Sequence, residues 1–136
     1  MKLNTAKLII GLFWGIGFLI SFIILIAQIF SGLYENPKVV FDWYTPIVAP
    51  ILGIIIVGFQ DDFRNPDPNA AEKTVTLPYF IITFILILLY NGILIGIFLF
   101  SVYGNRIEYY RQSGLLLGLI QATITGAITL LFKTKN

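Results

Sequence analysis

Four long stretches without a charged side chain divide this sequence. They cover residues 8–32, 43–60, 74–105 and 112–132. A hydrocarbon core about 30 Å thick is crossed by roughly 20 helical residues, so each stretch is long enough to span a bilayer as an α-helix. The sequence therefore predicts an all-α integral membrane protein, a bundle of four transmembrane helices.

The composition supports this class and argues against several others. Hydrophobic residues make up 57% of the 136 residues and charged residues only 12%, whereas about one quarter of an ordinary soluble domain is charged. The net charge of +2 is spread over short clusters and forms no basic stripe, so we expect the lipid bilayer, and no nucleic acid, as a partner. Because the chain has no Cys and no His, thiolate or histidine catalysis and Cys or His metal sites are excluded. We expect no enzyme activity and no cofactor.

The helices are predicted at about residues 8–32, 43–60, 78–103 and 113–132, within a single transmembrane domain over residues 1–136. The third helix is expected to start at Pro78, because the fixed φ of proline suits the first turn of a helix. The first apolar run is much longer than that of a secretory signal, and no small-residue cleavage motif follows it. We therefore expect this helix to remain in the mature protein.

The positive charges predict an orientation. An even number of crossings puts both termini on one side, and this side has six Lys and Arg residues against three on the other. The first set is Lys2, Lys7, Arg64, Lys73, Lys133 and Lys135, and the second is Lys38, Arg106 and Arg111. The positive-inside rule then places both termini and the Gln60–Thr76 loop in the cytoplasm. This loop is a hydrated connector or, alternatively, a docking site for a soluble partner.

The last predicted helix carries small and polar residues along one side. At 100° per residue they fall within about one third of the helix circumference, and we call them the polar stripe: Gly114, Gly118, Gln121, Ala122, Thr125 and Thr129. Small residues at this spacing let two helices approach closely. Alternatively, the stripe lines a water-filled path. Helices packed about 8 to 10 Å apart leave no room inside one bundle, so such a path requires several copies.

Asn91 lies close to the centre of the third predicted helix. An unpaired amide at that depth costs several kcal/mol, so Asn91 needs a partner. Gln121 and Thr125 lie at a similar depth in the last helix and are the predicted partners. A structural hydrogen bond is one interpretation. A neutral polar constriction, formed by Asn91 from several copies, is the other.

The second predicted helix contains Pro46 and Pro50. Each proline lacks a backbone donor, which frees the carbonyls of Asp42 and Pro46 and predicts a kink. A helix that began at Pro46 would rise only about 21 Å by Phe59, too short for the bilayer core. Either the helix begins near Asp42 and bends, or its outer half is irregular and its free carbonyls meet water or a cation.

These features favour transport or assembly over catalysis. No carboxylate lies well inside a predicted span, so proton-coupled exchange has no obvious carrier. The leading hypothesis is a small homo-oligomer that forms or gates an ion-permeable pore lined by Asn91, Gln121, Thr125 and Thr129. A membrane-permeabilising effector would be one such protein. The alternative is a non-catalytic accessory or scaffold subunit of a larger membrane complex, and a small lipid or solute carrier is a third class.

Overall fold

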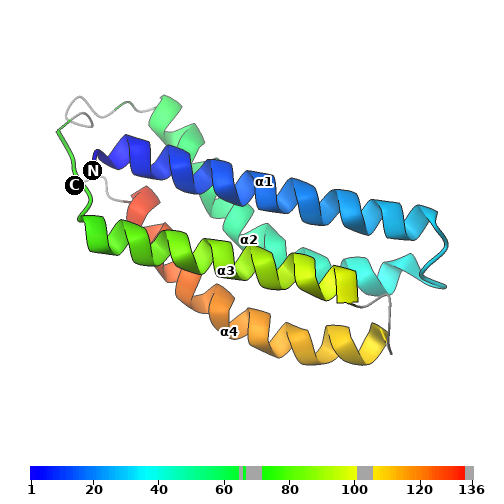
Figure 1. The fold of residues 1–136 in the computed structure, drawn as a ribbon. Helices are drawn as coiled ribbons and strands as arrows, with labels where there is room; N and C mark the ends of the chain where they lie inside the picture. The colour runs from blue at the N-terminus through cyan, green and yellow to red at the C-terminus, as the bar shows by residue number, and fades with distance from the viewer. Residues whose placement is uncertain (65, 67–71, 101–105, 134–136) are drawn as a thin grey trace.

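The computed structural model describes residues 1–64, 66, 72–100 and 106–133. They form four α-helices: α1 (Leu3–Phe30), α2 (Pro37–Arg64), α3 (Leu77–Phe100) and α4 (Arg106–Lys133). All four helices are long and apolar enough to cross a membrane, which confirms the prediction of four such helices. α1 begins and α4 ends at the same end of the bundle (Figure 1). We call this the terminal end and the opposite end the hairpin end.

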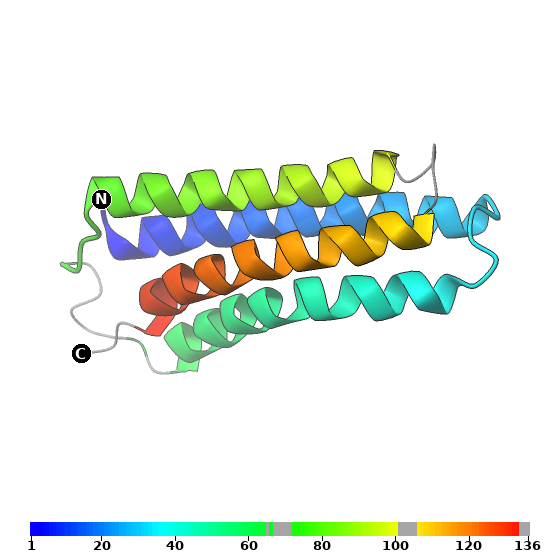
Figure 2. The ribbon, with the colours of Figure 1, turned by 90° about the horizontal axis from the view of Figure 1, so that it is seen from below.

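The helices form a ring in the order α1, α3, α4, α2. α1 packs along α3 and α2 packs along α4, and both of these pairs are parallel (Figure 2). α3 and α4 are antiparallel neighbours, whereas consecutive α1 and α2 make much less contact. Each helix therefore packs mainly on a helix that is distant in sequence.

Helix α1 ends two residues before the predicted limit because of Gly32. This glycine has a φ of +71°, and its N–H donates to the Ile29 carbonyl at 3.0 Å. The Leu33 N–H donates to the Gln28 carbonyl at 3.1 Å. These two bonds form a Schellman motif, in which a glycine in the left-handed conformation terminates the helix.

Helix α2 begins at Pro37. The predicted start near Asp42 is therefore wrong, and so is the alternative of an irregular outer half. Asn36 caps the helix, since its side-chain oxygen accepts a hydrogen bond from the Lys38 N–H at 3.1 Å. Pro37 follows at the first helical position, where proline is favoured. The backbone then stays helical through Pro46 and Pro50 to Arg64.

Several other limits also differ from the sequence prediction. α1 starts at Leu3 instead of residue 8, α2 ends at Arg64 instead of residue 60, and α4 ends at Lys133 instead of residue 132. α4 starts at Arg106, because Glu108 accepts hydrogen bonds from Arg111 at 2.9 Å and Gln112 at 2.8 Å, three and four residues along the helix. Such pairs support a polar first turn, whereas only the apolar part from residue 113 was predicted. α3 starts at Leu77, one residue before Pro78. Its predicted end at residue 103 lies outside the described residues.

The N-terminus pairs with the segment that precedes α3. Lys2 and Thr74 form an antiparallel bridge, in which the Val75 N–H donates to the Met1 carbonyl at 2.8 Å and the Leu3 N–H donates to the Lys73 carbonyl at 2.9 Å. The second bond satisfies a donor that the first turn of α1 leaves unpaired. The bridge therefore joins the starts of the parallel helices α1 and α3.

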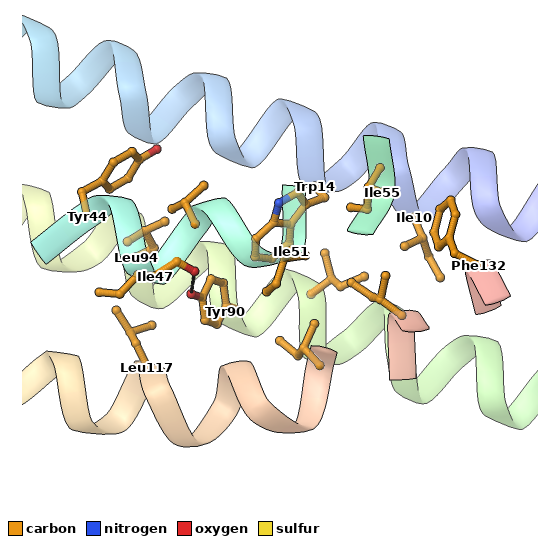
Figure 3. Packing of buried hydrophobic residues seen from close by; sticks show 14 of the residues in the cluster. Ile10, Trp14, Tyr44, Ile47, Ile51, Ile55, Tyr90, Leu94, Leu117 and Phe132 are labelled. Atoms are coloured by element: carbon orange, nitrogen blue, oxygen red, sulfur yellow. Dashed lines mark hydrogen bonds between the residues drawn. The ribbon is translucent and has the colours of Figure 1, made fainter. Parts of the chain in front are cut away.

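Large side chains fill the middle of the bundle (Figure 3). Trp14 of α1 and Tyr90 of α3 are 1% and 0% exposed, and their ring centroids lie 5.1 Å apart. Ile51 of α2 and Leu117 of α4 are also fully buried. As expected for a single four-helix bundle, side chains occupy its axis.

Candidate functional site

The proline segment of α2, residues 46–50, accepts side-chain hydrogen bonds from α3 and α4, and α1 bonds to α2 one turn earlier. Pro50 has no N–H, so the Pro46 carbonyl lacks its helical donor. The Nε2 of Gln121 in α4 donates to this carbonyl at 3.2 Å. The sequence predicted that this carbonyl would be free, and the structure shows that a side chain from α4 caps it.

Two further bonds hold the same part of α2. The Tyr90 hydroxyl of α3 donates to the Ile47 carbonyl at 2.8 Å (Figure 3). One turn earlier, the Tyr44 hydroxyl lies 2.8 Å from the Ser21 hydroxyl of α1. Two consecutive α2 carbonyls, those of Pro46 and Ile47, therefore accept from α4 and α3. The Tyr90 bond is buried, and removing one partner of a buried hydrogen bond leaves the other partner unsatisfied, which is destabilising.

Asn91 lies beside Tyr90 but faces α1 instead of α4. A Cβ on Gly17 of α1 would overlap the Asn91 carboxamide, and the Asn91 Nδ2 donates to the Ile87 carbonyl at 3.0 Å. The predicted pairing of Asn91 with Gln121 or Thr125 is wrong, because α1 is the parallel neighbour of α3 on this side. Asn91 is 8% exposed and packs helices within one copy.

The polar stripe lies at the edge of the buried face of α4. The buried hydrophobic residues of α4 are Tyr110, Leu117, Ile124, Ile128, Leu131 and Phe132. Within the stripe, Gly114 lies against Trp43 of α2, whose Nε1 would be 3.4 Å from an added Cβ. Gln121, Thr125 and Thr129 are half-buried, whereas Gly118 and Ala122 are exposed. One edge of the stripe thus contacts α2, and the other remains uncovered in a single copy.

An ion pair at the terminal end was missed by sequence reasoning. The Lys7 ammonium of α1 contacts both oxygens of Asp62 in α2 at 2.8 and 3.1 Å, and the side chains are 5% and 33% exposed. The Phe132 ring of α4 lies 5.5 Å from the ammonium. A signal was present, because Lys7 has helical spacing with the buried Leu3 and Ile10 and shares their face.

The tyrosines at the hairpin end bond to one another. The Tyr34 hydroxyl donates to the Gln28 side-chain oxygen at 2.6 Å and also contacts the Tyr110 hydroxyl. The Gln28 Nε2 donates to the Phe98 carbonyl at 2.9 Å, in the last turn of α3. The sequence indicated only that aromatic residues gather at this end. Their hydrogen bonds join α1, α3 and α4.

Within residues 1–64, 66, 72–100 and 106–133, no group of three or more His, Cys, Asp or Glu is placed to hold a metal ion. The polar atoms at the proline segment instead form interhelical hydrogen bonds. No protein-family model matches the chain, and neither a curated protein nor a solved structure matches it.

Proposed function

We propose that this protein is a multi-pass membrane protein with both termini in the cytoplasm. The length and apolarity of its four helices support insertion. The start of α1 and the end of α4 share the terminal end. The described members of the larger set of Lys and Arg residues, Lys2, Lys7, Arg64, Lys73 and Lys133, belong to the segments at this end, as the positive-inside rule requires of a cytoplasmic face.

We further propose that copies of the chain assemble and form or gate an ion-permeable path between them. The observation that carries this proposal is the position of the polar stripe. The middle of one bundle is filled by Trp14 and Tyr90, whereas Thr125 and Thr129 are only half-buried and Gly118 is exposed. Polar side chains at membrane depth tend to face protein or water, and a second copy could supply either.

The proline segment of α2 is a candidate hinge. α2 lacks two helical hydrogen bonds near Pro46 and Pro50, which lowers the cost of bending there. The Gln121 bond to the Pro46 carbonyl links this hinge to the helix that carries the polar stripe. A soluble partner at the predicted Gln60–Thr76 loop could act on the hinge, because the first residues of that segment form the end of α2, which runs to Arg64. A membrane-permeabilising effector would use such coupling.

An accessory or scaffold subunit is the second candidate. A Cβ added at Gly118 would meet no atom within 4 Å, so the backbone of a helix from a different protein could approach α4 there. This candidate predicts a chain that is monomeric or aggregated when purified alone, and that conducts no ions.

The two candidates are separated by oligomer mass in detergent and ion flux in liposomes. We expect a defined homo-oligomer whose flux falls at least about tenfold in the Thr125→Leu/Thr129→Leu variant, because leucine replaces polar lining with apolar side chains. Thr123→Leu is the matched control, since Thr123 is exposed on a different side of α4. Unchanged flux in the double variant would refute the lining assignment. A monomer without flux would favour the accessory subunit.

A further inference from the structure

A groove on the outer face of α2 runs from the proline segment toward the terminal end. It encloses about 480 Å³ and is lined by Pro50, Gly53, Ile54, Val57, Gly58 and Asp61 of α2 and by Phe132 of α4. This volume falls within the range of about 300 to 1,000 Å³ typical of small-molecule sites. Gly53 leaves the helix surface open, since an added Cβ would meet no atom within 4 Å, whereas the Phe132 ring packs on Gly58 and forms a wall of the groove.

The length of the groove matches one leaflet of a bilayer. Eleven residues separate Pro50 from Asp61, a rise of about 16 Å along the helix, and half of a hydrocarbon core is about 15 Å. If the bundle spans the membrane as proposed, the groove extends from mid-bilayer to the head groups on the terminal side. An acyl chain lying along Pro50–Val57 would therefore bring its head group to Asp61.

The charges at the mouth of the groove indicate which head group fits. Of the described residues that line it, Asp61 alone is ionisable, and Arg64 follows one turn later with an exposed side chain. A carboxylate and a guanidinium at this spacing complement an ammonium and a phosphate. Asp61 also interacts within the chain, but the two oxygens of a carboxylate can accept several hydrogen bonds.

We propose that this groove is a binding site for a phosphatidylethanolamine lipid of the terminal-side leaflet. The acyl chain lies against Gly53, Ile54 and Val57, the ammonium donates hydrogen bonds to Asp61, and the phosphate pairs with Arg64. The inference rests on the proposed membrane insertion but not on pore formation.

The test measures the thermal unfolding midpoint of the full chain in detergent. Dioleoyl phosphatidylethanolamine should raise the midpoint by about 4 °C or more. Dioleoyl phosphatidylcholine, whose methylated ammonium has no N–H, and dioleoyl phosphatidylglycerol should raise it less. Asp61→Asn should abolish the preference for ethanolamine over choline. Equal shifts with all three lipids would overturn the proposal.

A second, independent test fills the groove with a larger side chain. Val57→Trp should remove the lipid effect, whereas Ile56→Trp, on a different face of α2 and similarly exposed (52% against 62%), should retain it. Gly53→Leu, where an added Cβ meets nothing within 4 Å, serves in place of Val57→Trp if that variant misfolds.

If both filling variants kept the full lipid effect but lost oligomer mass, the groove would be an interface between copies and the proposal would be wrong. If the unmodified chain formed a conducting oligomer but showed no lipid preference, this inference alone would be refuted. If it showed the lipid preference as a monomer without flux, only the proposed pore would be refuted.

Discussion

Replacing Asp62 by asparagine should destabilise the folded bundle by about 3 kcal/mol. The Lys7 side chain is 5% exposed, and its ammonium bonds to both oxygens of Asp62. Removing one partner of a buried ion pair typically costs about 3 to 5 kcal/mol, because the other charge is left uncompensated. We expect the low end of this range, since Asp62 is one-third exposed. The free energy of unfolding, measured by titrating sodium dodecyl sulfate into detergent-solubilised protein, checks this value.

The same ion pair should respond asymmetrically to mutation. Lys7→Met should cost less than Asp62→Asn, because the remaining Asp62 side chain is 33% exposed and can be hydrated, whereas the Lys7 side chain is only 5% exposed. Combining Lys7→Met with Asp62→Leu should recover much of the stability, as apolar replacements of buried pairs often do. Asp42→Asn is the control, since the Lys38–Asp42 pair is exposed at both side chains and should contribute at most about 0.5 kcal/mol. Equal losses in Asp62→Asn and Asp42→Asn would show that burial of Lys7 does not matter.

Gly17→Ala should destabilise the contact between α1 and α3 by about 2 to 3 kcal/mol. An added Cβ would overlap the Asn91 side chain, and the Asn91 bond to the Ile87 carbonyl restricts its movement. Overpacking of this kind costs about 1 to 3 kcal/mol, and the loss of a buried hydrogen bond adds to it. The measurement is again the free energy of unfolding in detergent.

Two further variants test whether overlap with the Asn91 side chain causes the loss of stability in Gly17→Ala. Gly15→Ala, where an added Cβ meets no atom within 4 Å, should be neutral or slightly stabilising, because alanine favours the helix over glycine. The Gly17→Ala/Asn91→Ala double variant should be more stable than Gly17→Ala, since the smaller side chain makes room for the new methyl group. Strictly additive losses in the double variant would exclude direct contact between the two residues.

The four helices could be predicted from the sequence because charge-free length is a strong signal. The sequence prediction misplaced their ends where hydrogen bonds at the helix termini set the limit. Asn36 and Pro37 start α2 before its apolar stretch, and polar bonds of Glu108 extend the first turn of α4. The left-handed Gly32 ends α1 inside its apolar stretch. Hydropathy responds to none of these local hydrogen bonds, so it misplaces the limits by several residues.

The sites were less predictable than the helices, because periodicity defines the faces of one helix but not the neighbour of each face. Asn91 was expected to meet Gln121, yet the ring order places α1 against Asn91 and α2 against Gln121. The freed Pro46 carbonyl was identified from the proline spacing alone, since that consequence is local. Its partner depends on the packing of α4 beside α2, which no pattern within either helix specifies.

The central claim is that copies of this chain surround a water-filled path lined by the polar stripe. The chain contains no cysteine, so a single Thr125→Cys variant in liposomes can be treated with a charged, membrane-impermeant thiol reagent while ion flux is recorded. The claim predicts that the reagent blocks flux through Thr125→Cys and leaves flux through Leu116→Cys unchanged, because Leu116 is exposed on another side of α4. Flux that persists in treated Thr125→Cys, or is blocked only in Leu116→Cys, would contradict it.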